Sequence, residues 1–174
     1  TIKKRSEGLL AFVKDYRTIS SVPIPKLKKI NVKQFLNTIH LLMKQALEEA
    51  SITFQLLPIP ANATINADSK LIEQVLINLI NNSIHALEGR NTPTIKVSCV
   101  IENDKTILII TDNGKGIEEE ILHQIFIPFY TTKKNGSGIG LSLSKNILKK
   151  HGGNLLVNSE PGAYTTFSLV FKEE

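Results

Sequence analysis

The stretch DSKLIEQVLINLINNSIHALEG, residues 68–89, carries the strongest structural signal in the chain. Its apolar residues recur every three or four positions, which predicts a long helix with a wide buried face. Asp68 is suited to cap the start of this helix, because its carboxylate can accept hydrogen bonds from free backbone N–H groups. Gly89 is suited to end it. The rest of the chain must therefore supply a layer that covers this helix.

Three polar residues, Asn78, Asn82 and His85, interrupt the apolar pattern on one face of this helix. They are neighbours because residues three or four apart lie on the same side of a helix. Buried amides need partners, and an unpaired one costs roughly 1–3 kcal/mol. Amide oxygens are also suitable ligands for Mg²⁺. Two interpretations stay open at this point: satisfied core amides, or a site for a metal ion and phosphate.

The segment TDNGKGI, residues 111–117, directly follows an apolar strand. It places Asp112 at the end of that strand, with Gly114 and Gly116 behind it. This pattern is either a simple tight turn or a carboxylate held over a pocket. In the second case the glycines let a planar ring approach the backbone closely.

The segment GSGIGLSLS, residues 136–144, runs directly into a predicted helix. Its spacing differs from the dinucleotide-binding pattern G-x-G-x-x-G, and no strand precedes it. The chain also lacks the P-loop pattern G-x-x-x-x-G-K-[ST]. A glycine-rich loop that opens a helix remains, where free N–H groups and the helix dipole favour phosphate.

The remaining pattern predicts a mixture of helices and strands. Helices are expected over 1–20, after Asn31, near 118–124 and over 140–151, and strands within 51–58, 64–67, 94–101, 106–111, 154–159 and 164–171. Pro23 and Pro25 break the helical pattern, so we divide the chain into a helix at 1–20, a linker at 21–29 and a domain at 30–174. The predicted class is α+β, a two-layer sandwich in which helices cover a mixed, mostly antiparallel sheet.

Composition excludes several other classes of protein. Of 174 residues, 41% are hydrophobic and 21% charged, as in a soluble globular protein. No apolar stretch approaches the roughly 18 residues of a membrane span. Cys99 is the only cysteine, which suits a reducing cytoplasm. Residues 1–30 carry a net charge of +6, but no motif or aromatic pattern there supports nucleic-acid binding. Because the chain starts at Thr1, we expect it to be a fragment.

Four motifs in a fixed order resemble the ATP-binding catalytic domain of sensor histidine kinases, which belongs to the GHKL superfamily with the Bergerat fold. QVLINLINNSIHAL resembles the N box, TDNGKGI the G1 box, IFIPFYTTK the F box and GSGIGLSLSKNI the G2 box. The similarity runs from about residue 28 to residue 174. RSEGLLAFVKDYR, residues 5–17, resembles the end of the second dimerisation helix that precedes this domain.

The resemblance implies a role for each matching position. Asn82 would bind Mg²⁺, with Asn78 and His85 near the phosphates. Asp112 would accept a hydrogen bond from the adenine amino group. Phe126, Phe129 and the loop through Lys133 and Lys134 would form a lid over ATP. Thr165 would lie behind the adenine, although Tyr164 replaces the glycine usual before it. The full set implied for the nucleotide site is Asn78, Asn82, His85, Asp112, Gly114, Gly116, Ile117, Phe129, Thr131, Thr132, Lys133, Gly136, Ser137, Gly138, Gly140, Leu141 and Thr165.

Two departures bear on the expected reaction. Hydrolytic relatives carry a glutamate base where this chain has Asn78, which cannot take a proton. The phosphorylated histidine of the family precedes an acidic residue, and none of His40, His85, His123 and His151 does. The resemblance therefore implies phosphoryl transfer from ATP to a histidine on a missing upstream helical domain, and then to an aspartate of a response regulator receiver domain. The full-length parent would be a homodimer, and its membrane anchoring is left open. Alternatives are a serine kinase of this fold and a nucleotide-binding regulatory module without transfer activity.

Overall fold

The computed structural model describes residues 21–133 and 136–172. The predicted dimerisation helix at 1–20 and Lys134 lie outside these ranges. The elements are β1 (Lys28–Asn31), α2 (Val32–Glu49), β2 (Thr53–Leu56), β3 (Thr64–Ala67), α3 (Ser69–Ala86), β4 (Thr94–Glu102), β5 (Lys105–Asp112), α4 (Glu119–Leu122), α5 (Gly140–Lys150), β6 (Asn154–Glu160) and β7 (Tyr164–Lys172).

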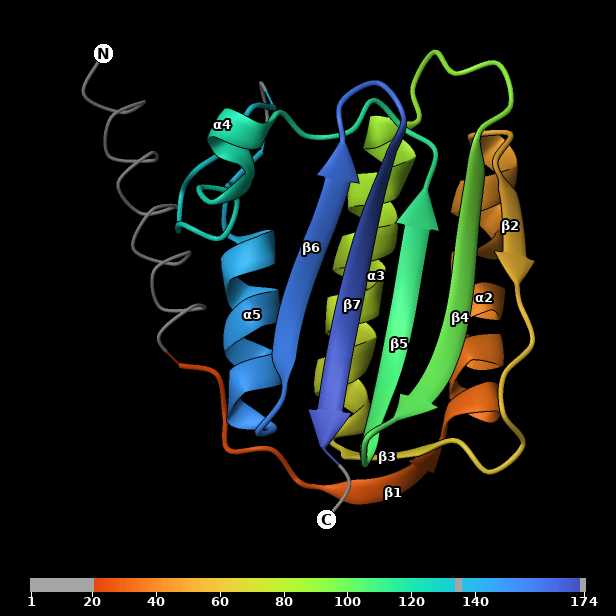
Figure 1. Ribbon diagram of the computed structural model, residues 1–174, viewed down its shortest axis with the longest axis vertical. Coiled ribbons are helices and arrows are strands. Elements are labelled where there is room, and N and C mark those ends of the chain that lie inside the picture. The colour runs from red at the N-terminus through yellow and green to blue at the C-terminus, as the bar shows by residue number, and fades with distance from the viewer. Residues whose placement is uncertain (1–20, 134–135, 173–174) are drawn as a thin grey trace, which may run out of the picture.

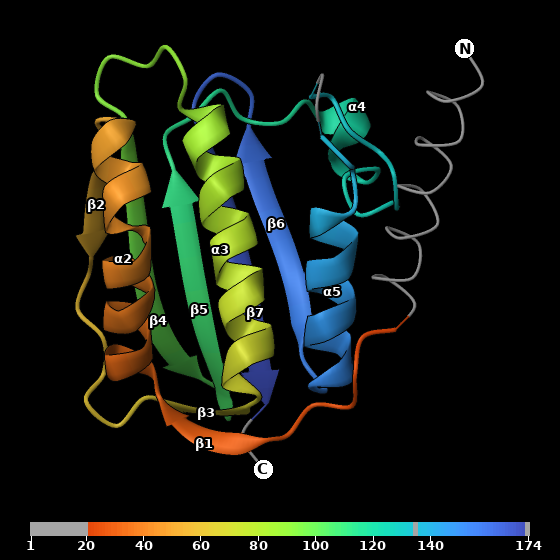
Figure 2. The same cartoon turned by 180° about the vertical axis from the view of Figure 1, so that it is seen from behind.

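The main sheet has five strands in the order β2-β4-β5-β7-β6. Strand β2 pairs parallel with β4, and the other neighbours pair antiparallel. Helices α2, α3 and α5 lie side by side on one face of this sheet, with α3 in the middle (Figures 1 and 2). The prediction of an α+β fold with a mixed, mostly antiparallel sheet covered by helices is confirmed.

The core lies between the helices and the inner face of the sheet. Alternate residues of β5 are buried because successive side chains point to opposite faces of a strand. Leu108 lies opposite Leu169, and Ile110 lies opposite Phe167, so both pairs belong to the inner layer. Asp112 continues this row at the end of β5. The alternation of buried residues along β5 therefore places the Asp112 carboxylate at the edge of the apolar core.

Helix α3 begins as expected, since the Asp68 side chain accepts from the backbone N–H groups of Lys70 and Leu71. Helix α5 ends at Lys150 before the Gly152–Gly153 pair, and Gly152 has a φ of +70°. This left-handed conformation is easy for glycine and closes the helix. None of the helices in the described part of the chain has the length and hydropathy needed to span a membrane.

The segment expected to be a linker is attached to the domain. Strand β1 starts at Lys28, inside the range 21–29, and pairs antiparallel with β3. The Lys26 N–H donates to Asp68 Oδ2 over 3.0 Å, and the Lys150 ammonium donates to the Val22 carbonyl. The segment thus contacts the N-terminus of α3 and the C-terminus of α5. These are the ends of the two helices away from Asn82 and Gly140.

Candidate functional site

The central group of the candidate site is the buried carboxylate of Asp112, which is 2% exposed. Its Oδ2 accepts from the Ser83 hydroxyl over 2.8 Å, and its Oδ1 accepts from the Gly114 N–H over 2.9 Å. Burial raises the pKa of Asp112, and the two hydrogen bonds oppose this rise. Each carboxylate oxygen has a second lone pair beyond its one protein donor. The group can therefore accept a further hydrogen bond from a ligand.

Asn78 and Asn82 of α3 are half-buried and lie close to the glycine-rich segment. Asn78 Nδ2 donates to Ser144 Oγ in α5 over 3.0 Å. Asn82 Oδ1 accepts from the Lys133 ammonium over 2.7 Å. This amide oxygen thus already holds a positively charged group, and amide oxygens also suit a hard cation such as Mg²⁺. The residues present at this position therefore fit a metal ion.

Asp112 contacts the turn of α3 that carries Asn82. Ser83 follows Asn82 in α3, and its side chain bonds directly to Asp112. The carboxylate at the end of β5 is therefore bonded to the helical turn that also carries the Asn82 amide. An arrangement with the two residues on opposite sides of the molecule would have excluded a shared ligand.

The turn after Asp112 is held by backbone contacts. Gly162 N–H donates to the Lys115 carbonyl over 2.7 Å, and Arg90 donates to the carbonyls of Asn113 and Gly162. Gly116 has a φ of +70°, and a Cβ there would overlap the Glu160 carbonyl. Glycine is thus needed at 116 for packing against the turn between β6 and β7. The expected contact of Gly116 with a base edge stays a prediction.

Thr165 shares the inner face with Asp112, since the two are paired in the register of β5 and β7. It is 3% exposed, and its Oγ1 lies 3.0 Å from Ser159 Oγ. Ser159 also accepts from the Ile117 N–H over 2.9 Å and donates to the Tyr164 carbonyl over 2.7 Å. Thr165 is thus held on the inner face opposite Asp112, and its expected contact with adenine stays a prediction.

The glycine-rich segment closes against the F-box segment and α3. Phe129 N–H donates to the Gly138 carbonyl over 2.9 Å. Gly138 has a φ of +69°, and a Cβ there would lie 2.8 Å from Phe129 Cα. A Cβ at Gly140 would overlap Asn78 Oδ1. Glycine is therefore required at 138 by the backbone of Phe129, whereas a side chain at 140 would displace the Asn78 amide.

Lys133 and His85 lie at the outer side of the site. Lost hydration lowers the pKa of Lys133, and the Lys115 charge lowers it further. His85 is exposed, and its Nδ1 lies 2.9 Å from Glu88 Oε1. The hydrogen bond from His85 lowers the pKa of Glu88. His85 is thus available at the surface but does not contact Asn78 or Asn82 in any hydrogen bond of the described structure.

The other predicted positions belong to the same segments. Thr131, Thr132 and Ser137 are exposed, and the Thr131 hydroxyl accepts from the Lys133 N–H over 3.1 Å. A Cβ at Gly136 would lie 2.5 Å from Thr131 Oγ1. Leu141 is half-buried in the first turn of α5.

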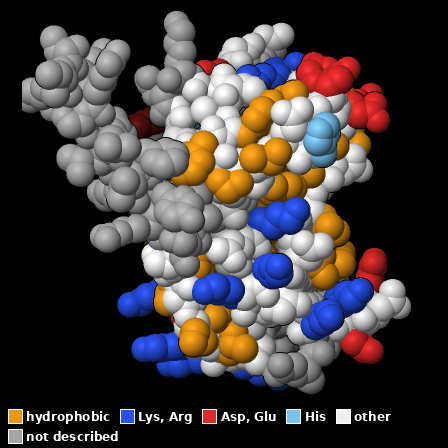
Figure 3. Space-filling view, turned by 90° about the vertical axis from the view of Figure 1, so that its left-hand side faces the viewer, with side chains coloured by type: hydrophobic (Ala, Val, Ile, Leu, Met, Phe, Trp, Pro, Cys, Tyr) orange, Lys and Arg blue, Asp and Glu red, His pale blue; other side chains and the backbone are white. Residues whose placement is uncertain are grey.

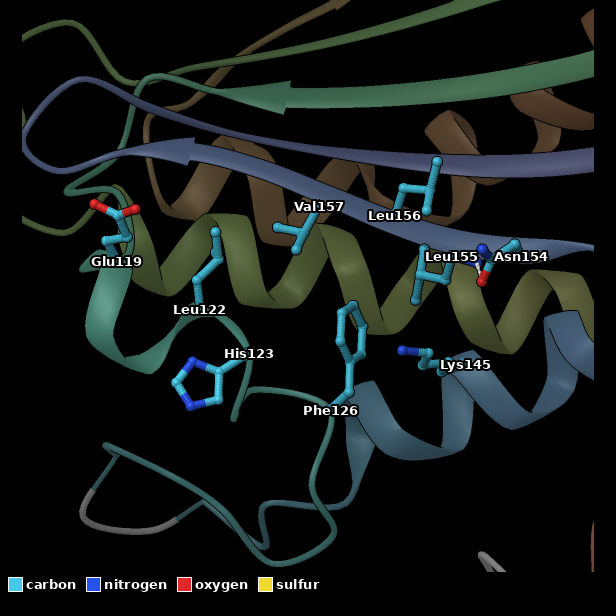
Figure 4. A pocket seen from close by; sticks show the side chains of 9 residues that line it. All are labelled: Glu119, Leu122, His123, Phe126, Lys145, Asn154, Leu155, Leu156 and Val157. Carbon is cyan, nitrogen blue, oxygen red and sulfur yellow. Dashed lines mark hydrogen bonds between the residues drawn. The ribbon is translucent and has the colours of Figure 1, made fainter.

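A groove lies elsewhere, between α4, α5 and β6. It has a volume of about 470 Å³, and Figure 4 shows Phe126 and Lys145 next to one another in its lining. Lys145 Nζ lies 4.3 Å from the centre of the Phe126 ring. Figure 3 shows this side of the molecule, where apolar side chains gather between acidic and basic ones. Neither Asp112 nor Asn82 lines the groove, so we assign the site by its polar chemistry instead.

Sequence reasoning missed Ser83 and Ser159. Ser83 stands inside the quoted helix, and its small polar side chain among apolar neighbours was the available signal. Within residues 21–133 and 136–172, no three His, Cys, Asp or Glu residues cluster as a metal site would require. A cation at this site would therefore depend on Asn82 and on the phosphates of its ligand.

Comparison with known proteins gives consistent results. Residues 67–174 match the family described as histidine kinase-, DNA gyrase B- and HSP90-like ATPases. The chain is 40% identical over 105 residues to sensor histidine kinase ZraS of Salmonella typhi, and these residues are 60% of this chain and 22% of ZraS. It is also 41% identical over 106 residues to histidine-protein kinase AtoS of Escherichia coli K12. These residues are 61% of this chain and 17% of AtoS.

Solved structures agree with the fold. The catalytic domain of histidine kinase ThkA superposes with a TM-score of 0.75 at 28% identity, covering 85% of this chain and 96% of that domain. The complex of ThkA with the response regulator TrrA gives a TM-score of 0.78 at 25% identity, covering 99% of this chain and 49% of ThkA. The chain spans about a fifth of the length of the curated relatives it matches.

Proposed function

Because the chain belongs to the family of histidine kinase-, DNA gyrase B- and HSP90-like ATPases, we propose that it is the catalytic, ATP-binding domain of a sensor histidine kinase. The observation that carries this proposal is the junction of Asp112 with α3 through Ser83. An acceptor for a purine amino group would then lie next to the helical turn whose amide oxygen suits a metal ion. A nucleotide is the ligand that needs both.

Asp112 would recognise the base. Its free lone pairs accept from the adenine 6-amino group, while Thr165 packs on the same inner face. Guanine has a carbonyl oxygen at this position, which would face the carboxylate without a proton between them. A buried polar group left unpaired costs roughly 1–3 kcal/mol, and more when it is charged. The pocket would therefore favour adenine nucleotides strongly.

Asn82 would hold Mg²⁺ through its side-chain oxygen, where the Lys133 ammonium lies in the structure. The bound ion supplies positive charge that neutralises the triphosphate. Asn78 and His85 lie on the same helix and would approach the phosphates from one side. Gly136, Gly138 and Gly140 would bring backbone N–H groups and the start of α5 to the other side. Lys133 would leave Asn82 and pair with the phosphates instead.

The reaction proposed is transfer of the γ-phosphoryl group rather than hydrolysis. Asn78 stands where a general base for water would be needed, and an amide cannot take a proton. A histidine nitrogen from an upstream dimerisation domain would attack the γ-phosphorus, and the bond to the bridging oxygen of ADP would break. A receiver-domain aspartate would then accept the group. The parent protein would act as a homodimer, with this domain in the cytoplasm.

Reconstitution tests this proposal. The upstream helical domain of the parent is supplied as a separate protein together with this chain and γ-labelled ATP. Label on that domain that is lost in acid and kept in base identifies a phosphohistidine and supports the proposal. Acid-stable label would show a serine kinase of the same fold. ATP binding without label would show a nucleotide-binding regulatory module. Asp112→Asn serves as the control, because it should abolish labelling at low ATP.

A further inference from the structure

The hydroxyl of Ser83 is buried and donates a hydrogen bond from α3 to the sheet. The residue is 1% exposed, and its Oγ lies 2.8 Å from Asp112 Oδ2. A serine inside a helix commonly bonds back to a carbonyl one turn earlier. Here the hydroxyl instead points at the carboxylate proposed to read the base. That choice of partner distinguishes Ser83 from an ordinary polar residue in a helix.

The hydroxyl completes a two-donor cradle for Asp112. Gly114 N–H approaches Oδ1 from the turn that follows β5, and Ser83 approaches Oδ2 from the helical layer. Two donors on different oxygens fix the plane of the carboxylate and favour its charged form. Burial acts in the opposite direction. Ser83 supplies the one side-chain donor to this carboxylate among the described residues.

We propose that Ser83 is a positioning residue that sets the selectivity of the site for a 6-amino purine over a 6-oxo purine. It acts through Asp112 and does not touch the nucleotide. With the donor in place, the carboxylate presents fixed lone pairs that accept from an amino group. Without it, the carboxyl group turns more freely and takes up a proton more readily, and its O–H then donates to a 6-oxo group. The inference rests on the proposed nucleotide function.

The test compares the binding of ATP with that of inosine triphosphate, which carries a 6-oxo group, by calorimetric titration of the whole chain. A hydrogen bond to a charged group is worth about 1.5–3 kcal/mol, which corresponds to roughly tenfold or more in affinity. Ser83→Ala should therefore lower the ratio of ATP affinity to inosine triphosphate affinity about tenfold. Ser83→Cys keeps the shape of the side chain at slightly larger size but is a weaker donor, so its ratio of ATP affinity to inosine triphosphate affinity should fall between those of the parent and Ser83→Ala.

Thr106→Val is the matched control, because it removes a buried hydroxyl from the other end of β5. Thr106 is 0% exposed and donates to the Thr64 carbonyl over 3.0 Å. This variant should keep the parent's ratio of ATP affinity to inosine triphosphate affinity even if its melting temperature falls. Ser83→Cys provides the measurement if Ser83→Ala does not fold.

The outcomes separate this inference from the proposed function. If the parent chain binds inosine triphosphate as well as ATP, the adenine assignment of Asp112 is wrong and the inference falls with it. A second outcome is that the parent chain binds ATP more tightly than inosine triphosphate while Ser83→Ala weakens the binding of both ligands by the same factor. In that case Ser83 has a structural role only, and the inference alone is overturned. A cysteine variant with the ratio of the parent would also overturn it, since volume rather than the donor would then set selectivity.

Discussion

Replacing Asp112 by asparagine removes one charge and changes no side-chain size. In the structure, Asp112 Oδ1 accepts from Gly114 N–H and Oδ2 accepts from the Ser83 hydroxyl. An asparagine can keep both contacts: its oxygen accepts from Gly114, and its NH₂ group donates to Ser83, whose hydroxyl then acts as acceptor. The Ser83 hydroxyl proton can then turn to a backbone carbonyl one helical turn earlier, so we expect the fold to be retained.

The same substitution should weaken ATP binding strongly. The bound adenine amino group would meet a neutral amide in place of a carboxylate, and one N–H of that amide would point toward the ligand. The loss is a hydrogen bond to a charged group, worth about 1.5–3 kcal/mol. At roughly 1.4 kcal/mol for each factor of ten, ATP affinity should fall by about 10- to 150-fold.

The assay is a calorimetric titration of ATP into the parent chain and into Asp112→Asn at one concentration of Mg²⁺. Circular dichroism of both proteins checks that the variant is folded. An ATP affinity equal to that of the parent in a folded variant would refute the assignment of Asp112 to the base. It would also remove the reason for placing the ligand between β5 and α3.

Three further results are expected. Asn82→Ala should abolish the part of ATP affinity that depends on Mg²⁺; an affinity in the parent that is the same with and without the ion would contradict this role. Gly138→Ala adds a Cβ 2.8 Å from Phe129 Cα at a φ of +69°, so ATP affinity should drop several-fold, whereas Gly89→Ala, with open space around it, should leave ATP affinity unchanged in the same titration. The N–H of Lys26 is the main cause that lowers the pKa of Asp68. The ionised carboxylate therefore adds stability above its unfolded pKa of about 3.9, and this stability is lost as the pH falls through the lower folded pKa. Asp68→Asn should flatten the dependence of the melting temperature on pH in that acid range, and an unchanged profile would rule out this contribution.

Helices and main strands could be predicted because their signals are local. The apolar period of residues 71–87 and the cap at Asp68 lie within the helix they specify. Strands β4 and β5 alternate in burial residue by residue, and only two residues separate them in the chain. The positions of Asp112 and Asn82 in neighbouring elements followed from these patterns together with the motif order.

Strand β1 shows where local signals end. Its four residues KKIN have two exposed lysines and no alternation long enough to identify a strand. The strand exists because it pairs with β3, more than thirty residues further along the chain. Pairing over such a separation depends on how the intervening helix α2 packs, and the sequence of β1 does not contain that information.

The sequence by itself determined the fold class, the helix that carries the amides and the presence of a carboxylate at the end of a strand, because periodicity and turn chemistry act over a few residues. Only the tertiary structure decided which groups touch. Ser83 meets Asp112 across 29 positions, Lys133 meets Asn82 across 51, and His151 accepts from the Asp68 N–H across 83. Such contacts arise where packed layers bring distant segments within hydrogen-bonding distance, which is a property of the folded chain as a whole.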